Sequence, residues 1–127
     1  MTYVGTGKIF RFQLHGRLDW QNGQQLQEQV SAIAADHYQG WVMDLSQVEF
    51  VDSSGLVALI LSLSMAKEVG VRLAICQLRP SVRLVFDISK LDRAFAIFDT
   101  YEAAATYCQP AALTQVADFS LRVGSRP

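Results

Sequence analysis

An acidic residue, two serines and a glycine stand in direct succession near the middle of the chain, and these residue types could do chemistry. The run is Asp52-Ser53-Ser54-Gly55, which follows an apolar segment and precedes a long apolar one. A hydroxyl at the start of a helix can cap it, attack a substrate as a nucleophile, or accept a phosphoryl group. Each chemistry needs different neighbours, so the rest of the sequence decides among them.

Catalysis by either serine would need a base that the sequence does not place. The candidate bases are His15 and His37, and the Gly-x-Ser-x-Gly turn of hydrolases is absent because glycine stands on only one side of the serines. Asp44 resembles the phospho-accepting aspartate of a receiver domain, but no acidic pair on an earlier strand could hold Mg²⁺ with it. We therefore expect a protein that is not an enzyme and that uses no metal or cofactor.

A phosphoryl group on Ser53 or Ser54 would lie where backbone N–H groups and the positive end of a helix dipole favour negative charge. It would add about 1.5 to 2 negative charges and three strong acceptors beside Asp52 without unfolding the domain. We therefore expect its effect at an interface with another protein. A serine that simply caps the helix is the competing interpretation, since serine and aspartate are both preferred caps.

The helix that begins at this turn is apolar on two sides and is expected to end near Gly70. The face expected to cover a sheet carries Leu56, Leu59, Ile60, Leu63 and Ala66. A second ridge carries Val57, Leu61 and Met65, diluted by Ala58, Ser62, Ser64, Lys67 and Glu68. Such a helix is either buried on both sides or presents one side to a partner, and the sequence leaves both open.

The remaining elements follow from apolar periodicity. Strands are expected at residues 9–15, ending at Gly16, and at 41–45, 71–76 and 95–98. Further helices are expected after Asn22, Pro80 and Thr100, of which Asn22 and Thr100 are candidate caps. This alternation of helices and strands predicts an α/β fold with a sheet that is at least partly parallel.

Composition excludes several classes of function. The chain has 127 residues, 50% of them hydrophobic, and a net charge of -1, so a nucleic-acid partner is not expected. Cys76 and Cys108 lack metal-binding spacing and indicate a reduced, cytoplasmic setting. The first residues lack a signal-peptide pattern, and no apolar run approaches the roughly 20 residues of a membrane span, so no membrane partner is expected.

Several segments of the chain keep the order and spacing of the segments of a known domain family. They are residues 14–19, 41–45, 50–56, 78–82 and 84–86. Together they resemble a STAS domain of the anti-sigma-factor antagonist type. The resemblance implies a single STAS domain over residues 1–109, with a mixed β-sheet of about four to five strands packed against about four helices. Residues 110–127 would form a C-terminal tail or accessory segment.

The resemblance also implies a function. In that family an anti-sigma factor with ATP-dependent serine kinase activity phosphorylates the first serine of the turn, here Ser53, with Ser54 as the alternative. A PP2C-type phosphatase reverses the reaction, and the unphosphorylated form captures the anti-sigma factor and frees the sigma factor. The implied partner-binding residues are Asp19, Asp52 and Gly55, together with the ridge Val57, Leu61 and Met65.

The chain departs from the family pattern at particular positions. Arg17 stands where an acidic residue is common, and Lys90 stands where glycine is common. The tail from Ala111 onward has no counterpart in the family. The alternative function is a constitutive STAS scaffold or ligand-binding module that regulates another signalling protein.

Overall fold

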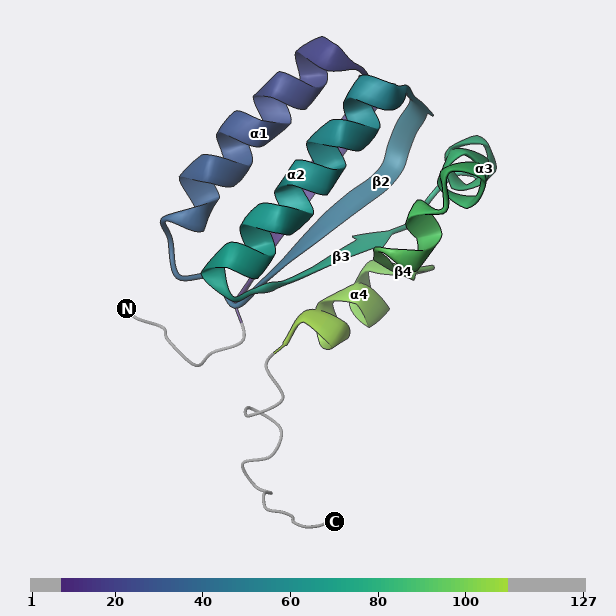
Figure 1. Cartoon of the computed structure of the whole chain (residues 1–127). Helices are drawn as coiled ribbons and strands as arrows, with labels where there is room; N and C mark the ends of the chain where they lie inside the picture. The colour runs from purple at the N-terminus through teal and green to yellow at the C-terminus, as the bar shows by residue number, and fades with distance from the viewer. Residues whose placement is uncertain (1–7, 110–127) are drawn as a thin grey trace.

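Strands and helices alternate along residues 8–109, the part of the chain that the computed structural model describes (Figure 1). The strands are β1 (Ile9–Leu18), β2 (Gly40–Val51), β3 (Arg72–Cys76) and β4 (Ala96–Phe98). The helices are α1 (Trp20–Ala34), α2 (Ser53–Val69), α3 (Pro80–Ser89), the 3-10 helix η1 (Leu91–Arg93) and α4 (Tyr101–Cys108). The predicted tail, residues 110–127, lies outside the described residues.

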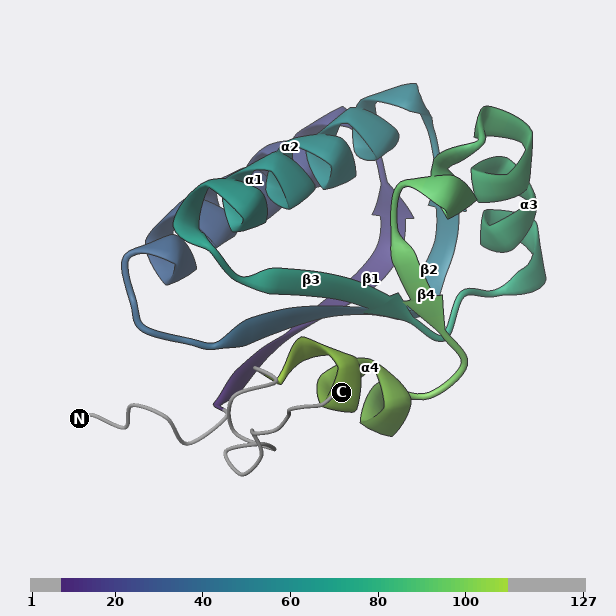
Figure 2. The same ribbon diagram turned by 60° about the horizontal axis from the view of Figure 1, so that its bottom comes forward.

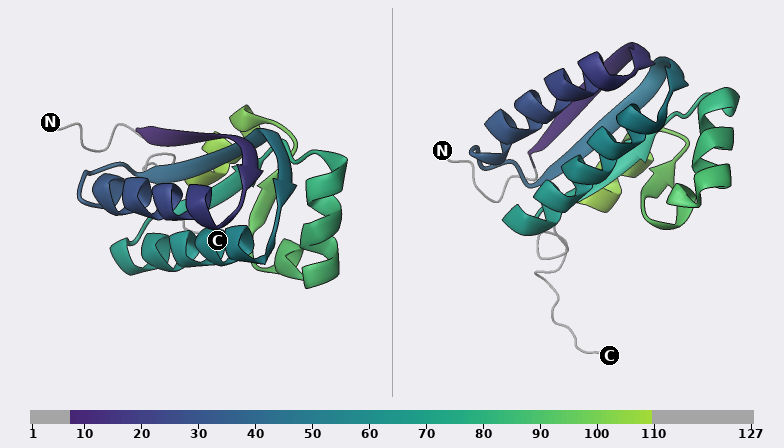
Figure 3. Two further views of the ribbon diagram at one scale, coloured as in Figure 1. Left: turned by 90° about the horizontal axis from the view of Figure 1, so that it is seen from above. Right: turned by 45° about the horizontal axis from the view of Figure 1, so that its top comes forward.

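The strands form one sheet in the order β1-β2-β3-β4, with helices on both faces. Figure 2 shows α1 and α2 side by side on one face and α4 on the other. Helix α3 lies on the far side of α2 from α1 (Figure 3). The predicted α/β fold is confirmed by this arrangement.

The antiparallel strand that a mixed sheet would contain is not found within residues 8–109. All pairings among the described strands are parallel. The reason is that a helix follows each of β1, β2 and β3 and carries the chain back along the sheet, so each new strand starts at the same edge as the last. An antiparallel pair needs no such crossover, and residues 8–109 contain no hairpin between neighbouring strands.

The hydrophobic core has two parts, one on each face of the sheet. The larger part lies between the sheet and helices α1, α2 and α3, and its largest fully buried side chains include Phe12, Trp41 and Phe86. The smaller part lies under α4 and consists of Val42, Ala74, Cys76, Ala104 and Cys108. Burying a large apolar side chain contributes about 1.5–3 kcal/mol, so the larger part carries most of the stabilisation.

Several predicted boundaries need correction. Strand β1 does not end at Gly16 but continues to Leu18, because Gly16 adopts a left-handed φ of 73° at a register shift in the β1–β2 pairing. The cap of α1 is Asp19 and not Asn22, whose backbone N–H donates to the Asp19 side chain. Strand β2 extends past the predicted 41–45 to Val51.

Other local predictions are confirmed. Helix α2 ends at Gly70, which caps it in the left-handed conformation at φ 80°. Pro80 occupies the first turn of α3. The Thr100 side chain accepts a hydrogen bond from the Ala103 N–H and caps α4. These signals are short-range, so the sequence specifies them without knowledge of the fold.

The buried face of α2 differs from the predicted face. Leu59 and Ala66 are buried as expected, but Ile60 is 39% exposed, and Ala58 and Ser62 are buried instead. The cause is α1, which packs so closely on α2 that a Cβ on Gly23 would lie 3.0 Å from the Ala58 Cβ. Small side chains therefore face the α1–α2 contact, and the Ser62 hydroxyl is satisfied by donating to the Ala58 carbonyl at 2.8 Å.

Candidate functional site

Two aspartates cap two helices at the same edge of the sheet. Leu18 and Val51 are partners in the β1–β2 pairing, and each is followed directly by an aspartate that begins a helix. The Asp19 carboxylate accepts a hydrogen bond from the Asn22 N–H at 3.1 Å. Helices α1 and α2 therefore begin side by side, as Figure 1 shows at its upper end, and their positive dipole ends lie at one edge.

The predicted serines follow the second cap. Asp52 accepts a hydrogen bond from the Gly55 N–H at 2.9 Å, so Asp52 and not a serine caps α2. Ser53 takes the first position of the helix and is exposed, whereas Ser54 takes the second and is half-buried. The competing interpretation, in which a serine caps the helix, is wrong. The Ser53 hydroxyl is accessible to a modifying enzyme.

Gly55 sets the distance between the start of α2 and β1. A Cβ at this position would lie 2.1 Å from the Leu18 carbonyl oxygen, far inside van der Waals contact. The Asp52 N–H donates to the same oxygen at 3.3 Å, which ties the turn to the end of β1. Gly55 is buried, so any part that it plays in partner binding comes through the position that it gives to Ser53.

The ridge predicted on α2 begins one turn after Ser53. Val57 is 51% exposed and Leu61 is 47% exposed, while Met65 is half-buried and packs against the core. Leu61 and Met65 also line a shallow groove of about 280 Å³ between α1 and α2. The structure therefore places the serine and the exposed part of the ridge on one continuous helix surface, and the use of this surface by a partner stays a prediction.

Two exposed aromatic side chains that the sequence did not single out lie close in the chain to the two capping aspartates. Trp20, the first residue of α1, is 66% exposed, and Phe50, at the end of β2, is 41% exposed. Arg17 stacks on Phe50, with its guanidinium carbon 4.3 Å from the ring centre. A signal was available, because Trp20 directly follows the Asp19 turn and a large apolar residue at the first position of a helix has little core to enter. We call Arg17, Trp20 and Phe50 the Arg17 patch.

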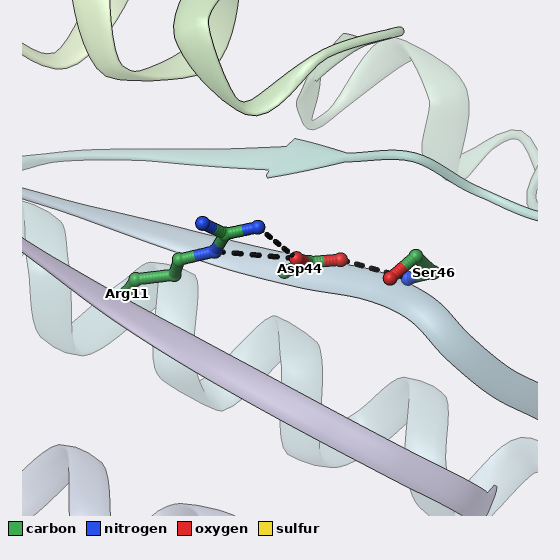
Figure 4. A network of polar contacts seen from close by, with 3 residues as sticks. All are labelled: Arg11, Asp44 and Ser46. Carbon is green, nitrogen blue, oxygen red and sulfur yellow. Dashed lines mark hydrogen bonds and ion pairs between the residues drawn. The ribbon is translucent and has the colours of Figure 1, made fainter.

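Asp44 is a buried acid on a central strand, and it forms an ion pair with Arg11 on the sheet face that α4 covers. Its carboxylate lies 2.6 Å from Arg11 and accepts a hydrogen bond from the Ser46 N–H at 2.9 Å (Figure 4). Burial raises the pKa of Asp44, but the hydrogen bonds from Arg11 and Ser46 outweigh it, so the net pKa lies below the ordinary value. Arg11 also stacks on Tyr101 of α4 at 4.2 Å. Asp44 therefore ties β1, β2 and α4 together.

The cysteines are not placed for nucleophilic chemistry. Burial raises the pKa of Cys76 and of Cys108 to about 11, so both thiols are protonated at neutral pH. Within residues 8–109 no group of three or more metal-ligating side chains is gathered. No helix in that range is long and apolar enough to cross a membrane.

Comparison with known proteins places this geometry in a family. Residues 1–104 match the family model of the STAS domain. BtrV of Bordetella bronchiseptica, assigned as an anti-sigma factor antagonist, is 32% identical over 92 residues, which cover 72% of this chain and 79% of that protein. The crystal structure of an anti-sigma factor antagonist from Mycobacterium paratuberculosis is 27% identical with a TM-score of 0.69, covering 85% of this chain and 89% of that one. A sulfate transporter family protein from Wolinella succinogenes shares the fold at 15% identity, with a TM-score of 0.73 over 90% of this chain and 93% of that one.

Proposed function

Because this chain belongs to the STAS domain family, we propose that it is an anti-sigma-factor antagonist whose binding is switched by phosphorylation of Ser53. The unphosphorylated form binds an anti-sigma factor that is also a serine kinase. Phosphorylation releases that partner, and a PP2C-type phosphatase restores the binding form. In this proposal the protein is not itself an enzyme, and it works in the cytoplasm.

The observation that carries the proposal is the position of Ser53. Its hydroxyl is exposed at the first position of α2, next to the two capping aspartates and one turn before the exposed ridge residue Val57. A phosphate there is favoured by the helix dipole by about 0.3–1 kcal/mol, so the fold tolerates it. The same charge buried against a partner without compensation costs about 2–5 kcal/mol, which is roughly 30-fold to several thousand-fold in affinity.

The same geometry favours Ser53 over Ser54 as the acceptor. Ser54 is half-buried, and its carbonyl oxygen faces α1, where it would lie 3.6 Å from a Cβ on Gly23. A kinase must surround the acceptor hydroxyl, and Ser53 can be reached without moving α1. Phosphorylation at Ser54 would keep the mechanism and change the site.

The direct test is incubation of the purified protein with the anti-sigma factor kinase of its host and ATP, followed by peptide mapping. We expect one phosphate, on Ser53. The Ser53→Ala variant should not be phosphorylated, and the host's PP2C-type phosphatase should remove the phosphate from the wild type. Labelling absent from both Ser53 and Ser54 would refute the proposal.

Binding to the same kinase gives a second test. Ser53→Ala should retain the complex, and Ser53→Asp should weaken it by about 100-fold, equivalent to about 2.7 kcal/mol. Ser81→Asp is a matched control, because Ser81 is also an exposed serine in the first turn of a helix, α3. We expect the control to bind as the wild type does.

The second candidate function is a constitutive STAS scaffold or ligand-binding module. It is favoured by the occurrence of this fold in a sulfate transporter family protein, a different class from the anti-sigma factor antagonists. Under this alternative Ser53→Ala and Ser53→Asp bind the partner equally, and no phosphate is transferred to the turn.

A further inference from the structure

Arg17 and Phe50 form a stacked pair at the ends of two neighbouring strands. They are partners in the β1–β2 pairing, and the guanidinium carbon lies 4.3 Å from the centre of the ring. Both side chains are exposed. Stacking uses the flat face of the guanidinium and leaves the N–H donors at its edge for another group. It also limits the conformations of the side chain, so less freedom is lost when the arginine binds.

The charge of Arg17 is not neutralised within the part of the chain that the structure describes. Arg11, the other arginine of β1, is paired with the buried Asp44, whereas Arg17 makes no ion pair with any described residue. The acids that follow the two strands, Asp19 and Asp52, are engaged with backbone N–H groups of their own helices. Arg17 is therefore a fixed, exposed cation with unused donors.

The stacked pair lies close in the chain to the proposed switch. Phe50 precedes Ser53 by three residues, so their Cα atoms are at most about 11 Å apart. Trp20 follows Arg17 by three residues and is the most exposed of the large apolar side chains at this edge. Tryptophan and arginine are over-represented among residues that dominate protein interfaces. A partner that covers Ser53 and also extends over the ends of β1 and β2 would meet the Arg17 patch.

We propose that the Arg17 patch recognises a carboxylate on the partner, with Trp20 and Phe50 packing against apolar side chains beside that carboxylate. The proposal rests on the proposed function, because the partner is the same anti-sigma factor. Charge complementarity commits the occupant to an acidic segment, since a basic one would be repelled by Arg17. The patch thus selects which anti-sigma factor is bound, while Ser53 determines when.

The test measures binding of the unphosphorylated protein to the purified anti-sigma factor kinase of its host, at about 0.05 M and about 0.5 M salt. At low salt we expect Arg17→Ala to weaken binding about 10-fold and Arg17→Glu about 100-fold. Both losses should shrink at high salt. Phe50→Leu, which removes the stacking ring, should also weaken binding. Arg93→Glu, a charge reversal at an exposed arginine of η1, should change affinity less than about twofold.

The outcomes separate this inference from the function on which it rests. A wild-type complex that Arg17→Glu leaves unchanged at low salt would overturn the patch and leave the phospho-switch intact. If Arg17→Ala changes only the binding of the phosphorylated form, Arg17 interacts with the phosphate and the inference is wrong. A wild type that neither binds the kinase nor accepts a phosphate would overturn both. Circular dichroism of each variant checks that the exposed substitutions leave the fold in place.

Discussion

Replacing Gly55 by alanine would place a methyl group where the backbone of β1 already lies. A Cβ on Gly55 would be 2.1 Å from the Leu18 carbonyl oxygen and 2.8 Å from its carbonyl carbon. That is about 1.3 Å short of the 3.4 Å at which ordinary contact begins. The alanine Cβ is fixed to the backbone and the Leu18 carbonyl is itself backbone, so no side-chain rotation can relieve the clash, and the start of α2 must move away from β1.

The energetic cost follows from this displacement. Overpacking a filled site costs about 1–3 kcal/mol, and a clash with backbone belongs at the upper end. Alanine recovers at most about 1 kcal/mol over glycine within a helix. We therefore expect Gly55→Ala to lose about 2 kcal/mol of unfolding free energy. Because a shift of about 1 Å can cost about 100-fold in a positioned reaction, phosphorylation of Ser53 should slow as well.

Urea denaturation measures the stability, and a timed assay with the host kinase measures phosphorylation. Gly70→Ala is the matched control, since Gly70 has a φ of 80° but nothing within 4 Å of its position for a Cβ. The control should lose about 1 kcal/mol from backbone strain and accept phosphate at the wild-type rate. If Gly55→Ala were within about 0.5 kcal/mol of the wild type and equally well phosphorylated, Gly55 would not position the turn.

Four further substitutions test other parts of the structure. Asp44→Asn should cost about 2 kcal/mol at neutral pH, because it breaks the ion pair with Arg11. Because the folded-state pKa of Asp44 is lowered, its carboxylate stabilises the fold at neutral pH, and this stabilisation is lost as the pH falls through that pKa. The unfolding free energies of the variant and the wild type, measured by urea titration, should therefore converge in acid. Lys90→Gly should gain about 0.5–1 kcal/mol in urea denaturation, because Lys90 ends α3 at a left-handed φ of 66°, and a loss would show that its side chain contributes. Asp52→Ala should lower the melting temperature by the equivalent of about 1 kcal/mol and Ser53→Ala by less than half of that, and the opposite ranking would mean that the serine caps α2.

The sequence predicts those features that depend on neighbours along the chain. Local residue preferences predict the start of α2 at the serine turn, its end at Gly70 and the place of Pro80 in the first turn of α3. The position of Ser53 at the head of an apolar helix follows from the same signals.

The features that the sequence could not supply depend on contacts between distant segments. Whether Ala58 and Ser62 dilute an exposed ridge or face a second helix depends on how closely α1 approaches, and that is set by Gly23, 35 residues before Ala58. The pairing of Arg17 with Phe50 likewise depends on a register that shifts twice along the β1–β2 pairing. Periodicity along one element carries no information about either contact.

In the proposed function, the residue that caps α2 and the residue that is phosphorylated are different, and this separation would allow the turn to act as a switch. If Ser53 were the cap, a phosphate would remove the hydrogen bond that starts α2, and modification would cost stability as well as binding. Asp52 makes that hydrogen bond instead, and Gly55 fixes the backbone against Leu18, so Ser53 carries no structural duty. A charge added to its hydroxyl would therefore change the surface that begins at Val57 and leave the fold beneath it in place. A partner would then respond to the phosphate directly, without any conformational change in this protein.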